Sequence, residues 1–218
     1  MKMLGLSLIL CVLSASAAEE IVFQDDFKEK LGEGWTWIRE DRAGWRVAKE
    51  GLEVRVQPGN MWGSANDAKN VLVRPVPDPG TGTIEVSVIA SNRPAGQYEQ
   101  ADLVWYYDDG DMVKIGLEEV DDQVCVVMGR EEADKTRTIA KVVLGERSVG
   151  LRFVVSGDKI RGQFRPGEET KESTWKDAGE CTLPAKGDPK ASLQVYQGPP
   201  GADRWARFRA FRIIRRRE

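Results

Sequence analysis

The stretch YEQADLVWYYDDGDMVKIGLE, Tyr98–Glu118, decides the fold of this chain. Two runs rich in apolar residues flank the sequence DDGD at Asp108–Asp111. Aspartate and glycine tolerate the backbone angles of a tight reversal, so the segment predicts a β-hairpin with a short turn.

The two faces of this hairpin differ in polarity, because side chains along a strand alternate with a period of two. One face is apolar and consists of Ala101, Leu103, Trp105, Tyr107, Val113, Ile115 and Leu117. The other face carries an amide, two carboxylates, an ammonium and a phenol, from Gln100, Asp102, Tyr106, Lys114 and Glu118. Such a pattern predicts an antiparallel sheet with one packed face and one solvated face.

The rest of the chain is also made of short alternating runs, broken by Gly, Pro, Asn and Asp. The further predicted strands are 22–27, 45–47, 52–56, 71–73, 83–89, 124–128, 139–144, 149–155, 160–164, 192–196 and 205–214. No window predicts a long amphipathic helix. About a dozen strands without helices indicate an all-β sandwich or barrel, and a jelly roll of two antiparallel sheets fits best.

Motifs along the chain match the pattern of a known family. In the hairpin these are QADL at Gln100–Leu103, the pair Tyr106–Tyr107, and VKIGLE at Val113–Glu118. Others follow in the expected order at Asp25–Phe27, Gly34–Trp37, Gly51–Leu52, Trp62, Asn70–Arg74, Ala206–Phe208 and Phe211.

Through these motifs the chain resembles the concanavalin A-like lectin/glucanase superfamily. Within it, the chain is similar to the regulator-of-enolase-like domains of largely unknown function and to the C-terminal module of family 43 β-xylosidases. The resemblance covers nearly the whole mature chain and implies a concanavalin A-like jelly-roll β-sandwich. Asp102 departs from the pattern, which usually has glycine at that position.

The N-terminus has the form of a secretory signal peptide. Lys2 precedes an apolar run over 3–13, and the small residues SASAA follow at Ser14–Ala18. The apolar run is too short to span a bilayer, and Leu10 is too large for a lipoprotein signal at Cys11. We therefore expect cleavage of residues 1–18, a single domain over 19–218, a secreted or periplasmic location and no transmembrane anchor.

Charge and composition exclude several classes of function. The formal net charge is −3, and it becomes one unit more negative without Lys2, which argues against a nucleic-acid partner. The chain has no histidine. Its absence removes the usual base of a serine or cysteine hydrolase and the commonest metal ligand.

Two cysteines, Cys125 and Cys181, survive the expected cleavage. In an oxidising compartment they would form one disulfide worth about 3 to 4 kcal/mol. The alternative is two separate buried thiols, because a large β-sandwich core does not require such a link.

The polar face of the hairpin is the candidate ligand site. In concanavalin A-like folds the concave outer face of one sheet binds or cuts carbohydrate, and carboxylates and amides suit sugar hydroxyls. The candidate ligand-binding residues are Trp62, Gln100, Asp102, Tyr106, Lys114 and Glu118. Trp62 lies in a loop rich in turn formers, where it serves either as a ligand contact or as a structural plug. The alternative for the whole face is a solvated surface on which Lys114 pairs with Glu118 or Asp102.

A non-catalytic module that binds a glycan or polysaccharide is therefore the main hypothesis. Glycoside hydrolysis needs two carboxyls, which Glu118, Asp102 and Glu85 would supply, but the E-x-D-x-x-E motif of glucanases with this fold is absent. A third hypothesis is an envelope protein-interaction module.

Two charged segments give weaker signals. The acidic turns Asp108–Asp111 and Asp121–Asp122 would suit calcium, but neither has an EF-hand pattern, so we expect no cofactor. The basic end from Arg204 to Arg217 fits an edge strand protected by arginine, or attraction to an anionic glycan.

Overall fold

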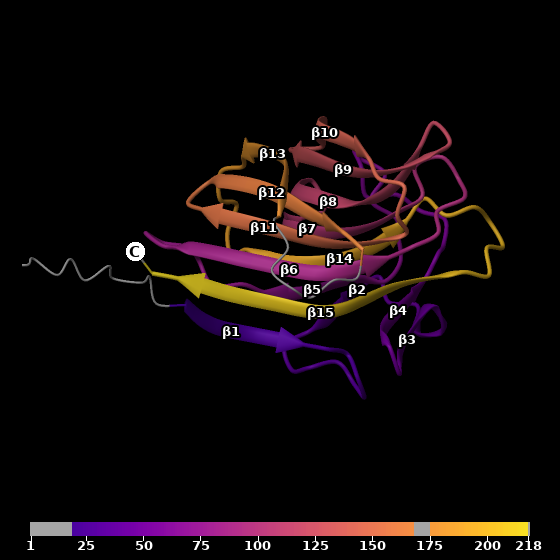
Figure 1. The fold of residues 1–218 in the computed structure, drawn as a ribbon, viewed down its shortest axis with the longest axis horizontal. Helices are drawn as coiled ribbons and strands as arrows, with labels where there is room; N and C mark the ends of the chain where they lie inside the picture. Colours follow the sequence, from indigo (N-terminus) through magenta and orange to yellow (C-terminus); the bar gives the residue numbers. More distant parts are fainter. Residues whose placement is uncertain (1–18, 168–174, 218) are drawn as a thin grey trace, which may run out of the picture.

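The computed structural model describes residues 19–167 and 175–217, and its elements are strands apart from one short turn. The predicted leader lies outside the described residues. Two antiparallel sheets pack face to face, which confirms the jelly-roll β-sandwich (Figure 1). The one helical segment of the described residues is the 3-10 turn Arg42–Gly44, so none of them forms a helix that would cross a membrane.

The first sheet has eight strands. Its order is β13 (Lys176–Thr182), β12 (Lys159–Pro166), β11 (Ser148–Ser156), β6 (Thr83–Ser91), β15 (Trp205–Arg216), β4 (Gly51–Arg55) and β3 (Trp45–Ala48), with β1 (Glu19–Asp25) also paired to β15. Figure 1 shows the long yellow β15 between the magenta β6 and the indigo β1. The first part of β15 pairs with β4 and its last part pairs with β1, so this strand joins the two N-terminal segments to the sheet.

The second sheet has seven strands. Its order is β10 (Lys135–Val143), β9 (Gln123–Glu132), β8 (Asp111–Val120), β7 (Gln100–Asp108), β14 (Lys190–Tyr196), β5 (Val71–Pro75) and β2 (Thr36–Ile38). The predicted hairpin forms β7 and β8 at the centre of this sheet, and its turn is Asp109-Gly110 as expected.

The main core lies between the two sheets. The apolar face of the hairpin enters it, and Leu103, Trp105, Ile115 and Leu117 are at most 1% exposed. Burying such a side chain contributes roughly 1.5 to 3 kcal/mol, so this face fixes the register of the hairpin against the other sheet. The predicted alternation is therefore confirmed for the packed side.

Candidate functional site

The polar face of the hairpin is buried rather than solvated, which corrects the sequence-based expectation. Gln100 is 2%, Asp102 1%, Lys114 3% and Glu118 6% exposed. Parity correctly placed these side chains on the face opposite the main core, but it carried no information about what covers that face. The alternative of a merely solvated surface is wrong about solvation for the same reason, whereas its pairing of Lys114 with Glu118 is observed at 2.9 Å.

The cover is the segment 56–70, which lies across the outer face of the seven-stranded sheet. A second apolar cluster forms beneath it, separate from the main core. Its buried members are Met61, Ala68, Val71, Val73, Val104, Tyr106, Met112 and Tyr196, with Ile38 and Trp62 packed against them. The sheet therefore has apolar packing on both faces at this end.

Polar contacts hold the covering segment in place. Both carboxylate oxygens of Glu131, on β9, accept the backbone N–H of Gly63 at 3.1 Å. The Arg39 guanidinium donates to the carbonyl of Ala68 at 2.8 Å and to the carboxylate of Asp109 at 2.6 Å. Together they attach the segment to Asp109 in the hairpin turn and to β9 of the sheet, so it forms a fixed wall.

A cavity of about 330 Å³ remains between this wall and the sheet, and we call it the Trp62 cleft. It is lined by Asn60, Trp62, Tyr98, Gln100, Lys114, Glu118, Val127, Thr138 and Gln197. The structure therefore brings together four of the six residues predicted from the sequence, namely Trp62, Gln100, Lys114 and Glu118.

Trp62 has a structural contact as well as a place in the cleft wall. Its six-membered ring lies over the backbone of Gly129 on β9, so close that a Cβ at position 129 would lie 2.4 Å from Cη2. The Lys114 ammonium lies 4.8 Å from the centre of the indole ring, within the range of a cation–π contact. The ring is thereby held in one orientation at the edge of the cleft.

Lys114 organises the polar floor of the cleft. Its ammonium donates to Glu118 Oε2 at 2.9 Å and to the side-chain oxygen of Gln100. Gln100 Nε2 in turn donates to the carbonyl of Tyr98 at 2.8 Å. A buried ion pair needs such further hydrogen bonds to offset its desolvation, so these three side chains form one preorganised unit.

Asp102 and Tyr106 do not line the cleft, contrary to prediction. Asp102 lies under the floor, where burial raises the pKa of its carboxyl to about 7 although the Lys114 ammonium opposes this. Tyr106 lies under the covering segment and donates its hydroxyl to Asp109 at 2.8 Å. Burial and this hydrogen bond raise the pKa of Tyr106.

Two residues at the rim of the cleft have a positive φ, as do nine other non-glycine residues elsewhere in the described chain. Tyr98 has a φ of 67° and Gln197 a φ of 60°, in the left-handed region that non-glycine residues rarely adopt. Both residues line the cleft, and Tyr98 is 51% exposed.

Glu85 belongs to the other sheet, which removes it from the predicted carboxylate cluster. It lies on β6, where its carboxylate accepts from Arg216 Nε at 2.7 Å and from Arg152 at 3.3 Å. Both sheets alternate polar and apolar residues, so parity alone did not tell which sheet carries Glu85.

The two cysteines are free thiols, so of the two alternatives for Cys125 and Cys181 the structure has the separate thiols and no disulfide. Cys125 lies on β9 and Cys181 on β13, in different sheets. Burial raises the pKa of Cys181 to about 11 and also raises that of Cys125.

The acidic turn Asp108–Asp111 already has protein partners. Asp108 accepts the N–H of Gly110, and Asp111 accepts that of Ala133. Within residues 19–167 and 175–217, no three His, Cys, Asp or Glu side chains gather in a way that would hold a metal ion.

Sequence reasoning missed several residues of the cleft, chiefly Asn60, Tyr98, Thr138 and Gln197. Tyr98 stands at the start of the quoted hairpin sequence, where an aromatic side chain before the first strand was a usable signal. Thr138 and Gln197 reach the cleft from β10 and from the end of β14, through strand pairings that the local sequence does not encode.

Solved structures share this fold. The GH43 BlXynB protein from Bacillus licheniformis matches with a TM-score of 0.75 and 20% identity over 88% of this chain. The xylan beta-1,4-xylosidase from Bacillus halodurans matches with a TM-score of 0.73 and 18% identity over 87%. The chain spans only 39% and 38% of the lengths of those two proteins.

Another solved structure matches this chain over most of the length of both proteins. It is a functionally unknown protein from Saccharomyces cerevisiae, with a TM-score of 0.59, 15% identity, and coverage of 84% of this chain and 93% of that one. No curated protein matches the chain. The sequence model of the Beta xylosidase C-terminal Concanavalin A-like domain matches residues 24–186, three quarters of the chain, and the chain therefore belongs to that family.

Proposed function

We propose that this domain binds a saccharide in the Trp62 cleft and does not cleave it. The observation that carries the proposal is that one cavity of about 330 Å³ is lined by an indole ring and by the Gln100–Lys114–Glu118 unit. The volume is near the lower end of the roughly 300 to 1,000 Å³ usual for ligand pockets. A ligand of one or two sugar rings, such as a chain end, suits this size.

The chemistry of the wall fits a neutral sugar. Thr138 and Gln197 offer a hydroxyl and an amide group that both donate and accept hydrogen bonds, as sugar hydroxyls do. Lys114 and Glu118 neutralise each other at 2.9 Å, so the floor has little net charge. Aromatic groups such as Trp62 and Tyr98 provide the apolar surface against which a sugar face packs.

A glycoside hydrolase is the second candidate, and the arrangement of carboxyls weighs against it. That chemistry needs two carboxyl groups on either side of the glycosidic bond, roughly 5 to 10 Å apart. Of the three carboxylates considered, only Glu118 lines the cleft. Asp102 lies beneath the floor and Glu85 in the other sheet, so neither would reach a bond held in the cleft.

The test is a glycan-array screen of the purified protein, followed by calorimetry on the ligand found. Thr138→Val should weaken binding, because it removes a hydroxyl from an exposed position of the wall with little change in shape. Thr136→Val is the matched control, since Thr136 is exposed on the same strand but outside the cleft. Trp62→Phe should retain more affinity than Trp62→Ala.

Sugar release should be assayed in parallel. Release that Glu118→Gln abolishes while binding persists would replace the binding function with hydrolysis. No binding to any glycan by a folded protein would leave the protein-interaction module as the remaining hypothesis. Binding should be unchanged by EDTA, because the proposal assigns no role to calcium.

Export belongs to the same proposal. It rests on the N-terminal pattern of Lys2, an apolar run and small residues. Mass spectrometry of the protein from its native host should find an N-terminus near Glu19, and an intact Met1 would contradict export by this route.

A further inference from the structure

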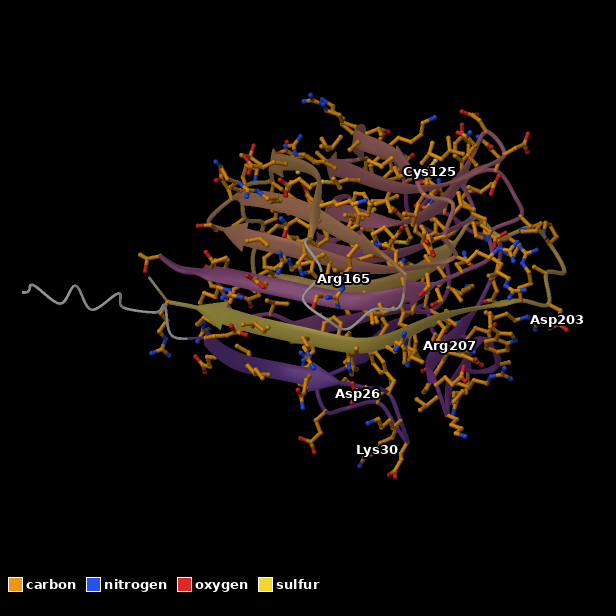
Figure 2. The ribbon with its side chains drawn as sticks, in the orientation of Figure 1. Asp26, Lys30, Cys125, Arg165, Asp203 and Arg207 are labelled. Carbon is orange, nitrogen blue, oxygen red and sulfur yellow. The ribbon has the colours of Figure 1, made fainter. Side chains whose placement is uncertain are left out.

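A second cavity, of about 650 Å³, lies at one end of the eight-stranded sheet and shares no lining residue with the Trp62 cleft. We call it the arginine cavity, because Arg46, Arg93, Arg147, Arg204 and Arg207 line it together with Trp205. Figure 2 labels Arg207 and Asp203, a further lining residue, and shows both toward the end of the sheet where β15 begins.

Neighbouring strands hold Arg93 and Arg147 on one side of this cavity. Ser91 ends β6 and Ser148 begins β11, and these two residues pair in register with their hydroxyls 2.8 Å apart. Just beyond the pair, the N–H of Asn92 donates to the carbonyl of Arg147 at 3.0 Å. Arg147 accepts this bond and Arg93 directly follows its donor, so the two arginines lie close together on neighbouring strand ends.

Protein carboxylates already pair with the other three arginines. Glu53 accepts from Arg46 at 2.7 Å and from Arg207 at 3.0 Å, and Arg204 pairs with Glu99. Although burial raises the pKa of Glu53, hydrogen bonds from Arg46 and Arg207 lower it overall, so this residue is ionised at neutral pH.

Arg93 and Arg147 differ from those three arginines. Both are exposed, and neither has an ion pair or a side-chain hydrogen bond to any residue in the described part of the chain. The cavity has five arginines against three acidic residues, Glu53, Glu146 and Asp203, and Asp203 faces Arg55 at 3.8 Å. The lining thus keeps a net positive charge and two guanidinium groups available to a ligand.

We propose that the arginine cavity binds an anionic saccharide. Arg93 and Arg147 contact its acidic group, and a sugar ring packs against Trp205. Guanidinium groups recognise planar or tetrahedral oxyanions through paired hydrogen bonds, so a uronate carboxylate and a sulfate ester are two sources of the same chemistry. Trp205 is half-buried and is held by the Arg46 guanidinium 4.2 Å from its ring centre, which leaves it as a fixed platform.

This site is independent of the proposed function, and its test is designed to keep the two apart. Calorimetry would use three probes of matched length: a short oligogalacturonate, a sulfated oligosaccharide and a neutral oligosaccharide, each at low and at physiological salt. We expect saturable binding of at least one acidic probe at physiological salt, and the comparison of the two identifies which oxyanion is preferred.

The double substitution R93Q/R147Q should weaken that binding by about tenfold or more, since each charge-assisted hydrogen bond contributes more than a neutral one. Arg161→Gln is the control, an exposed arginine of the same sheet that lies outside the cavity and pairs with Glu180 at 3.2 Å. Trp62→Ala should leave acidic-probe binding unchanged, whatever it does to neutral saccharides.

Three outcomes would overturn the proposal. They are the absence of saturable binding to both acidic probes, an unchanged affinity in R93Q/R147Q, or an equal loss in Arg161→Gln that reveals only diffuse surface charge. Both arginines are exposed, so the substitutions should not perturb folding, and circular dichroism would verify this.

Discussion

Asp102 on β7 lies directly opposite Gly116 on β8, and its carboxylate occupies the space that a side chain at position 116 would take. A Cβ at position 116 would lie 1.8 Å from Asp102 Oδ1 and 2.5 Å from the carbonyl oxygen of Ala101. The pair is therefore coupled: the acid is accommodated beneath the cleft only because its partner has no side chain.

Replacing this acid should change how stability depends on pH. Burial raises the pKa of Asp102 from 3.8 to about 7. Between about pH 4 and pH 7, the folded state therefore holds a proton that the unfolded chain has lost. The stability from this proton is complete below about pH 4 and is lost as pH rises through 7, by at most about 4 kcal/mol. Asp102→Asn should thus be more stable than the natural protein at pH 8 and similar to it near pH 4.

Urea unfolding at the two pH values measures this effect. Asp122→Asn, in an exposed turn, is the control and should leave the difference between the two pH values unchanged. If the difference in stability between the natural protein and Asp102→Asn were the same at pH 4 and at pH 8, the buried, protonated state of Asp102 would be contradicted.

The hairpin shows how far the sequence alone could predict this structure. Its parity and its Asp-Gly turn follow from local residues, because the period of two and the turn geometry act over a few positions. The burial of Lys114 and Glu118 depends on the segment 56–70, which is distant in sequence and reaches the sheet through contacts such as Glu131 to Gly63. The local pattern contains no trace of that contact.

The strands that sequence reasoning missed have a physical explanation too. β2 has three residues, fewer than the alternation test needs, and β13, with the sequence KDAGECT, is a largely polar strand at the edge of its sheet. Both take their conformation from pairing with a neighbour, β5 and β12 respectively, rather than from an apolar face of their own.

A side chain at position 129 should open the Trp62 cleft. The Cβ of Gly129→Ala would meet three ring atoms of Trp62 at 2.4 to 3.2 Å, so the indole ring must move. We expect a red shift of the tryptophan emission and weaker saccharide binding, although no other residue of the cleft is altered. Gly145→Ala is the control, because a Cβ there has no neighbour within 4 Å. Unchanged emission and affinity would contradict the packing of Trp62 on Gly129.

The hydrogen bonds between Glu131 and Gly63 should determine how often the covering segment opens. Glu131→Ala leaves the N–H of Gly63 without its partner, which costs about 1 to 3 kcal/mol, and Glu131→Gln should have a smaller effect because it keeps an acceptor. Hydrogen exchange of the amides in 60–68 should accelerate more in Glu131→Ala than in Glu131→Gln. Glu132→Gln is the control, since the neighbouring Glu132 pairs with Arg130 and not with the segment. Equal exchange in all variants would show that apolar packing alone holds the segment.

The two free thiols should react slowly with alkylating reagents in the folded protein and rapidly once it is denatured. Burial raises the pKa of Cys181 to about 11, and Cys125 is fully buried with its own pKa also raised, so little of either thiolate exists at pH 8. A thiolate is the reactive form. Alkylation of the native protein should therefore be slow, whereas denaturation without a reductant should expose both thiols to rapid reaction. Mass spectrometry of the alkylated protein counts them, and two unmodified cysteines that react only after reduction would instead indicate that Cys125 and Cys181 are joined.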